Sequence, residues 1–344
     1  MKIAMCKRNG SFSDGWSAAC EKMGITVVDV DVYSPKAIDQ IRACDGFMWH
    51  WHHASSKDWL FARQLIASCN LAHIPTFPDI KTCWNFDDKI GQSYLLTLLG
   101  LPAVRSWTFY QKEAILEWIR DASFPMVFKL RSGAGATNVR LVHNQMQARH
   151  LTRKMFGRGI PAVTMFGDIT TTVRQSRKKG QFLSKLLKAP KSFLKLLSLK
   201  VQLPRQKGYV YFQEFIPRNA YDTRIVVIGN KAIGIRRYCR PNDFRASGSG
   251  ELSYEKRLLP EECVRIAFEA SRKMQIQCGA FDFVYDDRCG KYLIVEVSYG
   301  FTPQAYGKCE GYWSPDMIWH DEKVEPERWM VEELVCQIEK VRTR

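Results

Sequence analysis

The sequence AFDFVYDDRCGKYLIVEVS, residues 280–298, contains two runs rich in β-branched and aromatic residues around a short polar turn. This pattern predicts an antiparallel hairpin of the strands Ala280–Tyr285 and Tyr292–Val297. Because facing positions in such a hairpin have a constant index sum, Asp282 is expected opposite Glu296. Period-two alternation then places both carboxylates on one face of the sheet.

The turn of this hairpin is expected near Cys289, and the same register places Val284 opposite Ile294. Two carboxylates side by side repel each other unless a cation lies between them, and oxygen ligands suit Mg²⁺ bound to nucleotide phosphates. Ser298 falls on the same face as a third oxygen donor. The alternative is a slipped register, in which one of the acids points into solvent.

A second hairpin, upstream, combines a lysine with a loop of small residues. The strands Met126–Leu130 and Val139–Val142 flank this loop, and Lys129 is the last polar side chain before it. A cation followed by free backbone N–H groups suits a polyphosphate, but the spacing is not that of a P-loop and glycine hairpins without a ligand are common. The candidate phosphate-binding residues are Lys129, Ser132, Gly133, Gly135 and Thr137.

The apolar run Tyr209–Ile216 is interrupted by a pair of polar residues. Adenine requires hydrogen-bonding groups inside an apolar slot, which such an interruption provides; an ordinary edge strand would have the same composition. The candidate adenine-binding residues are Gln213, Glu214, Phe215 and Ile216.

The chain has 344 residues, of which 46% are apolar, and this excludes a disordered protein. Short apolar runs at Lys2–Cys6, Thr26–Val30 and Gly46–Trp51 alternate with helical patterns, which predicts an open parallel α/β sheet. The last third is expected to be antiparallel sheet with helices on it, so the fold class is α/β (α+β). The expected parts are an N-terminal α/β domain at 1–80, a helical linking part at 81–123, a lid at 124–216 with a basic insertion at 174–207, and a C-terminal part with the metal site at 217–344.

The order of these parts resembles the ATP-grasp superfamily of carboxylate-amine ligases, over roughly Phe77 to Tyr306. The sequence is similar to the branch that contains the ribosomal-protein glutamate ligases through Phe212–Ile216, Asp222–Arg224 and Asn242–Arg245. The first 80 residues resemble the α/β domain that precedes the grasp in this family. The resemblance therefore implies an ATP-grasp fold with an N-terminal pre-grasp domain.

For the cofactors, the resemblance implies ATP between two antiparallel sheets, with Lys89 and Lys129 on its phosphates. The loop from Ser132 to Thr137 would close as a lid, the Gln213–Ile216 segment would line the adenine, and Asp222 would lie near the ribose or phosphate end. The implied Mg²⁺ ligands are Asp282, Glu296 and Ser298. The family usually has an asparagine at the third of these positions, and because a hydroxyl is a weaker ligand, the number of metal ions stays open.

The reaction that the resemblance implies converts a carboxylate into an acyl phosphate, which an amine then displaces to give an amide, ADP and phosphate. Arg224 and one of Arg236 and Arg237 are expected to bind the acyl phosphate. Arg245 and Ser247 lie in a loop where the family contacts the substrate carboxylate. A surface ion pair is the alternative for each arginine.

The pentapeptide Trp49–His53 carries three histidines. No cysteine or carboxylate completes a tetrahedral zinc site with them nearby. The segment follows a strand whose carboxyl end should open on the crevice where ligands bind, and packing at the strand end is the other interpretation. The candidate substrate residues here are His50, His52 and His53.

The net charge of +16 is concentrated in Arg174–Lys207, which has 11 basic residues and no acidic ones. Its alternation of leucine and lysine is typical of a helix on an anionic membrane surface, and a solvated insertion is the plainer interpretation. Nucleic acid is a less favoured partner because aromatic residues for base stacking are lacking. Eleven scattered cysteines without a CxxC pair, and no apolar run in Met1–Gly10, predict free thiols in a cytoplasmic protein, with the inner membrane surface as a peripheral location.

The sequence thus predicts an ATP- and Mg²⁺-dependent carboxylate-amine ligase. Its acid is a sugar acid of a surface polysaccharide, an amino acid or a peptide end, and the glycan idea depends on Trp49–His53, Gly311–Trp313 and the basic insertion. One alternative is an inactive nucleotide-binding sensor or scaffold, which Ser298 suggests. Another is a kinase-like enzyme that stops at phosphoryl transfer. The amine and the oligomeric state stay open.

Overall fold

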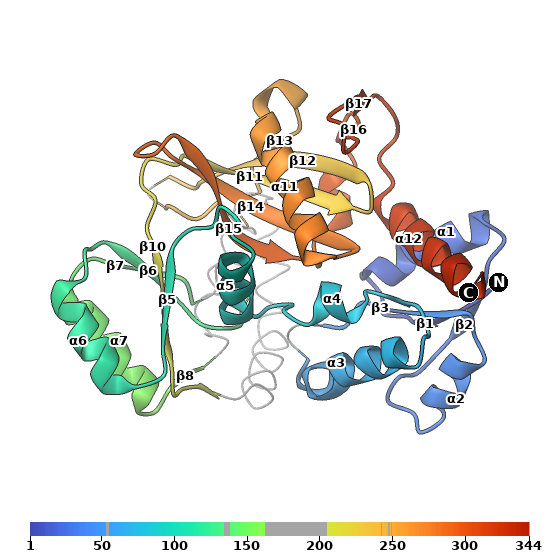
Figure 1. Ribbon diagram of the computed structural model, residues 1–344, viewed down its shortest axis with the longest axis horizontal. Helices are drawn as coiled ribbons and strands as arrows, with labels where there is room; N and C mark the ends of the chain where they lie inside the picture. Colours follow the sequence, from blue (N-terminus) through green and yellow to red (C-terminus); the bar gives the residue numbers. More distant parts are fainter. Residues whose placement is uncertain are drawn as a thin grey trace, which may run out of the picture.

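Three larger sheets, each drawn mainly from a different region of the chain, build the molecule (Figure 1). The N-terminal sheet is parallel and the other two are antiparallel, so the predicted mixed fold class is confirmed. The computed structural model describes residues 1–52, 55–133, 138–161, 205–241, 243–246, 248 and 250–343.

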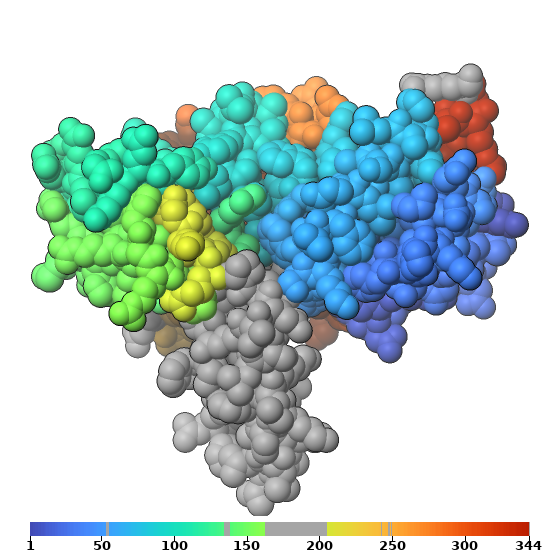
Figure 2. Space-filling model, turned by 90° about the horizontal axis from the view of Figure 1, so that it is seen from below, coloured from blue at the N-terminus to red at the C-terminus, as the bar shows by residue number. Residues whose placement is uncertain are grey.

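The N-terminal sheet and its helices consist of β1 (Lys2–Cys6), α1 (Phe12–Lys22), β2 (Thr26–Asp29), α2 (Ala37–Arg42), β3 (Gly46–Trp49), α3 (Ser56–Leu71), β4 (Thr76–Phe77) and the C-terminal helix α12 (Pro326–Arg342). The strand order is β2-β1-β3-β4, and all neighbours are parallel. Helix α12 lies beside α1, where the Trp16 indole N–H donates to Sδ of Met330 at 3.3 Å. Figure 2 shows the same proximity, with red C-terminal residues next to blue N-terminal ones.

The lid sheet has the order β5-β10-β6-β7. It consists of β5 (Ser106–Phe109), β6 (Met126–Lys129), β7 (Arg140–Val142) and β10 (Val210–Glu214), together with the helices α6 (Lys112–Asp121) and α7 (Gln145–Phe156) and the small pair β8 (Ile160–Pro161) and β9 (Arg205–Gln206). The β6–β7 hairpin that the sequence predicts is confirmed. The two helices lie at the far end of the molecule from the N-terminal sheet, and their apolar sides pack on the lid strands (Figure 1).

The C-terminal sheet has the order β15-β14-β11-β12-β16-β17, with β13 added to β12. Its strands are β11 (Tyr221–Ile228), β12 (Lys231–Tyr238), β13 (Leu252–Ser253), β14 (Cys278–Asp286), β15 (Lys291–Ser298), β16 (Tyr312–Trp313) and β17 (Trp319–His320). Around it lie α4 (Ile80–Cys83), α5 (Lys89–Leu98), α11 (Glu261–Met274) and the short helices η1 (Lys256–Leu258) and η2 (Pro303–Tyr306). One core packs between this sheet and α11, and a second core joins the sheet to the N-terminal elements.

The register of β14 and β15 decides how the carboxylates meet. Asp282 pairs with Glu296, as predicted, but Val284 pairs with Leu293 rather than Ile294. The difference comes from a β-bulge at Val295, which has no partner in β14 and shifts the register by one residue. The predicted index sum therefore holds from Asp282 toward the end of β15 and fails toward the turn.

Candidate functional site

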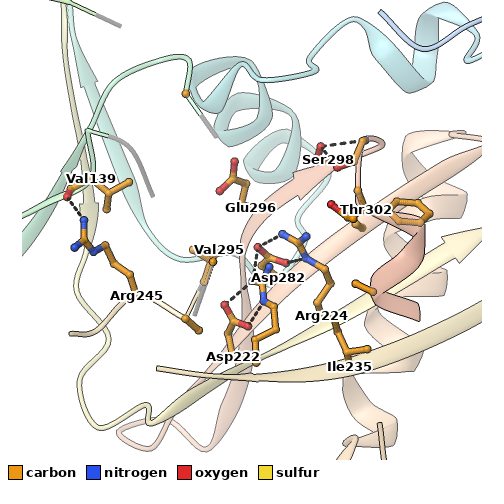
Figure 3. Close-up of a pocket in the computed structure, with 18 of the residues that line it drawn as sticks. Val139, Asp222, Arg224, Ile235, Arg245, Asp282, Val295, Glu296, Ser298 and Thr302 are labelled. Carbon is orange, nitrogen blue, oxygen red and sulfur yellow. Dashed lines mark hydrogen bonds and ion pairs between the residues drawn. The ribbon is translucent and has the colours of Figure 1, made fainter. Parts of the chain in front are cut away.

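A cavity of about 1270 Å³ lies between the lid sheet, the C-terminal sheet and the N-terminal loops. Its volume exceeds that of most small-molecule pockets and leaves room for two ligands. Figure 3 shows Asp282 and Glu296 between two ends, with Arg245 and Val139 at one end and Ser298 and Thr302 at the other. The predicted site residues that line it are His50, His52, Lys89, Lys129, Gly133, Gln213, Glu214, Phe215, Ile216, Asp222, Arg224, Arg237, Arg245, Asp282, Glu296 and Ser298.

Several predicted residues lie elsewhere. Arg236 faces away from the cavity, because neighbours on β12 alternate between the two faces of the sheet; its guanidinium donates to the carbonyl of Leu258 and stacks over Tyr221. Between Arg236 and Arg237, the structure thus brings Arg237 to the cavity. The Ser132 hydroxyl accepts from the amide of Gln206, and Ser132 is not among the lining residues. The positions of His53, Gly135, Thr137 and Ser247, and of the basic insertion from 174 to 204, lie outside the described residues.

Lys89, the first residue of α5, holds the start of the lid loop. Its Nζ donates to the carbonyl oxygen of Gly133 at 2.8 Å and lies 3.2 Å from Glu296. Asp87, 3.7 Å from the same Nζ, accepts the N–H of Gly133 at 2.8 Å, and burial raises the pKa of Asp87 to about 6. Burial opposes the charge on Lys89, but the two carboxylates outweigh it and raise the pKa of Lys89. Asp87 was not predicted from the sequence, although an acid two residues before the lysine is the signal that could have indicated it.

Lys129 at the end of β6 is a buried cation with 6% of its area exposed. Its Nζ donates to Oε1 of Gln213 at 2.6 Å, and the Gln213 amide donates in turn to the carbonyl oxygen of Val295 at 3.2 Å. Burial lowers the pKa of Lys129 to about 8. Within the described part of the chain, no carboxylate lies within 4 Å of its Nζ. Among the described residues, the buried ammonium group of Lys129 therefore has no anion beside it to balance its charge. Val295, the bulge residue, accepts from the Gln213 amide and so helps to hold the side chain that Lys129 contacts.

Two arginines and two aspartates form a chain of ion pairs on the C-terminal sheet (Figure 3). Arg224 donates to Asp282 from Nε at 2.5 Å and from Nη2 at 2.8 Å. Arg237 lies 2.8 Å from the second oxygen of Asp282 and also donates to Asp222 at 2.6 Å. Burial opposes ionisation of Asp282, but the two guanidinium groups hold its pKa well below the ordinary value.

The adenine candidates form the edge of the cavity at the end of β10. Glu214 does not point a free carboxylate inward, because it pairs with Arg288 at 2.8 Å. Its backbone N–H donates to the carbonyl oxygen of Arg105 at 2.8 Å. Phe215 packs edge-on against Phe244 with ring centroids 5.6 Å apart, and Ile216 is buried. The wall available to a base here is therefore mainly apolar.

The oxygen donors of the predicted metal site differ in availability. Glu296 keeps 31% of its side chain exposed, and Lys89 and Lys129 hold its pKa below the ordinary value against the effect of burial. Asp282 is engaged by the arginines, and the Ser298 hydroxyl is bonded to Gly300 in its own turn at 3.0 and 3.1 Å. One or two carboxylates suffice for Mg²⁺ when phosphate and water oxygens complete the shell, so this donor set fits the ion.

The segment with the predicted histidines begins at Trp49, the last residue of β3, so the strand ends two residues before the predicted Trp51. Its backbone is fixed by Asp58, a buried carboxylate that accepts the N–H of His52 at 2.5 Å. His50 stacks on Phe12 at 4.2 Å, and its Nδ1 lies 3.0 Å from the Ser11 hydroxyl. Both histidines line the cavity, in the company of the N-terminal loop that follows β1.

Residues 195–306 match the family model of the RimK-like ATP-grasp domain. No curated protein matches the chain. A RimK domain ATP-grasp protein from Sphaerobacter thermophilus is similar in structure, with a TM-score of 0.55, 14% identity, and coverage of 97% of this chain and 100% of that one. D-alanine–D-alanine ligase from Bacillus anthracis complexed with ATP has a TM-score of 0.53 at 11% identity, covering 100% and 99%. Biotin carboxylase from Campylobacter jejuni, in complex with a βγ-ATP ligand, has a TM-score of 0.58 at 13% identity, covering 97% and 70%. The expected ATP-grasp fold is confirmed by these structural neighbours, and residues 195–306 carry the match to the RimK-like ATP-grasp domain.

Proposed function

We propose that this ATP-grasp enzyme joins a carboxylate to an amine through an acyl phosphate. The observation that carries the proposal is Lys129, a buried lysine with no carboxylate within 4 Å in the described structure, at the wall of a cavity large enough for a nucleotide. A polyphosphate would supply the missing anion. Lys89 lies in the same cavity, and Glu296 stands beside it.

In this proposal Lys89 and Lys129 bind the phosphates, the end of β10 lines the adenine, and Asp222 lies toward the ribose or phosphate end. Asp282 and Glu296 hold Mg²⁺, which neutralises phosphate charge and orients the γ-phosphoryl group. Ser298, Gly133, Gly135 and Thr137 stay candidates for the metal and the lid. Lys89, Lys129 and Asp282 are buried, and the lower dielectric around them strengthens their electrostatic interactions.

The chemistry needs positioning and charge neutralisation rather than a covalent enzyme intermediate. A carboxylate oxygen attacks the γ-phosphorus of ATP, the bond to the bridging oxygen breaks, and ADP leaves. The amine nitrogen then attacks the acyl carbon, phosphate departs and the nitrogen loses a proton. In this proposal Arg224 and Arg237, which now contact Asp282, exchange part of that contact for the phosphoryl oxygens and stabilise them.

The test is ADP release by the purified chain with Mg-ATP, pooled carboxylates and pooled amines. We expect ADP formation that requires both pools. ADP formation that needs no amine would indicate a kinase-like enzyme. Thermal stabilisation by Mg-ATP without turnover on any acid would indicate a sensor, the alternative favoured by the engaged state of Asp282 and Ser298.

The substrates that we propose are a sugar acid of a surface polysaccharide, or an amino acid or peptide carboxylate, with an amine of unspecified kind. Arg245, His50 and His52 line opposite parts of the same cavity and are the candidate substrate contacts.

A peripheral position at an anionic membrane surface is proposed for the basic segment 174–207. Within the described residues, no helix combines the length and apolarity needed to cross a bilayer. Deleting residues 177–204 is expected to reduce sedimentation with vesicles containing anionic lipid, because about 1 kcal/mol per basic residue is lost near such a surface. Neutral vesicles serve as the control, and unchanged binding to anionic vesicles would contradict the proposal.

A further inference from the structure

We propose that the end of the cavity next to the N-terminal sheet binds a second anionic group of the substrate, and that Arg8 is the cation that receives it. The inference rests on the proposed function, because the reacting carboxylate of the same substrate would lie at the arginine pair. This second anionic group is a carboxylate or a phosphate, since both accept hydrogen bonds from a guanidinium group.

The guanidinium of Arg8 has no counter-ion among the described residues. It lines the cavity, its Nε is buried without a hydrogen-bond partner, and no carboxylate of the described residues lies within 4 Å of it. The backbone of Arg8 is fixed by Ser13, whose hydroxyl accepts the Arg8 N–H at 2.9 Å and donates to the Arg8 carbonyl oxygen at 3.1 Å. A fixed, partly buried cation with an unsatisfied donor is costly unless an anion completes it.

The fold places Arg8 where ligands bind in open α/β sheets. Strand β1 has β2 on one side and β3 on the other, so the chain changes direction between β1 and β3. The crevice lies beyond the carboxyl ends of these two strands, and there Arg8 follows β1 while His50 follows β3. The Ser11 hydroxyl bonds to His50 and makes no side-chain cap on α1, and the positive end of the α1 dipole lies at the same place.

A wall of aromatic rings leads from this end toward the arginine pair. His50 stacks on Phe12 at 4.2 Å, Phe12 meets Phe301 at 5.1 Å, and Phe301 meets Tyr306 at 5.2 Å. The hydroxyl of Tyr306 is buried without a partner, and its pKa is raised by burial although Arg224 acts against this. The wall therefore ends beside the ion-pair chain.

The residue before Phe301 is a glycine, and the packing around it leaves no room for a side chain. A Cβ at Gly300 would lie 2.8 Å from the Phe86 ring and 3.5 Å from Nε2 of His50. Figure 3 places Thr302, two residues later, on the side of Asp282 away from Arg245. The ligand that fits is an acid whose reactive carboxylate is separated from a second anion by a flat or apolar stem.

The other cation proposed for the substrate is less suited to this role. Arg245 is neutralised by Asp243, to which it donates at 2.8 and 2.9 Å, and it also contacts Val139 of the lid. Arg8 has no such partner in the described part of the chain. An anion at Arg8 thus replaces water rather than an existing ion pair.

The experiment compares anions of matched shape by calorimetry on the full chain with Mg²⁺ and a non-hydrolysable ATP analogue. The pairs are glutarate against its monoamide, and 3-phosphoglycerate against glycerate, so that carboxylate and phosphate sources are separated. In at least one pair we expect the wild type to bind the member with the second anionic group about tenfold or more tightly, because the other member lacks a hydrogen bond to a charged group. Arg8→Gln should abolish the preference, Arg8→Lys should keep part of it, and Lys7→Gln, an exposed neighbour, should leave it unchanged.

Two results would overturn the inference: a preference that persists in Arg8→Gln, or no preference in the wild type for either pair. As a control for folding, Arg8→Gln must bind the ATP analogue as tightly as the wild type. If Arg8→Gln fails to fold, Arg8→Lys takes its place in the comparison. If the wild type does not bind the analogue, the proposed function fails, and the anion comparison without nucleotide still decides the role of Arg8.

Discussion

Replacing Lys129 with methionine is expected to lower ATP turnover by at least about 100-fold while the protein stays folded. The loss of one preorganised charge at a phosphoryl group has effects of this size. Burial already disfavours the charged form of Lys129, so methionine removes a buried charge and the urea midpoint should stay the same or rise. Turnover is followed by ADP release and stability by urea unfolding.

The matched control for this variant is Lys112→Met, at the exposed start of α6 in the same lid. Near-normal turnover in Lys129→Met would remove this lysine from the site. The pH dependence gives a second readout: nucleotide phosphates favour the protonated lysine, so the Kd for a non-hydrolysable ATP analogue should rise above about pH 8. Below that pH the lysine is already charged and the Kd should stay flat, whereas Lys129→Arg should stay flat throughout.

Replacing Asp282 with asparagine is expected to lower the free energy of unfolding by about 3–5 kcal/mol, the cost of breaking a buried ion pair from one side. The carboxylate accepts from both Arg224 and Arg237, and of these two arginines only Arg237 has a second acidic partner, Asp222, among the described ion pairs. Urea unfolding at pH 7 measures the change. Asp287→Asn is the control, because the ion pair of Asp287 with Arg218 is exposed and should contribute less than about 1 kcal/mol.

The pH dependence of this difference has a defined sign. The arginines hold the pKa of Asp282 below its value in the unfolded chain, so its stabilising effect is complete above about pH 4 and is lost as the pH falls toward the lower, folded value. The gap between wild type and Asp282→Asn should therefore close in acid. A gap that is absent at pH 7 would show that the ion-pair chain does not hold the sheet together.

The sequence allowed the strands around the site to be predicted because period and turn position are local properties. Asp282 faces Glu296 as the index sum requires. The bulge at Val295 was not predictable, because the Gln213 amide that bonds to its carbonyl comes from a strand of another sheet. Helix α3 was missed, since its start depends on Ser55 capping the helix through the N–H of Asp58 rather than on an apolar period.

The chemistry of the site was less accessible to sequence reasoning than its residues were. The sequence names Lys129, but the absence of an acidic partner within 4 Å among the described residues is a property of the assembled sheets. Arg8 could have been found, because the rule that drew attention to Trp49–His53, a ligand site beyond the carboxyl end of a parallel strand, applies equally to the residues after Lys2–Cys6. The predicted domain boundaries stay a prediction.

The contact between α1 and α12 has a consequence for synthesis of the protein. The indole of Trp16 reaches Met330, and Arg342 pairs with Asp45 at 2.7 Å, so the N-terminal sheet is completed by a helix that is translated about 300 residues later. The N-terminal sheet therefore has an uncovered apolar face while the lid and the C-terminal sheet are translated. During that interval the exposed apolar surface makes the growing chain prone to aggregation.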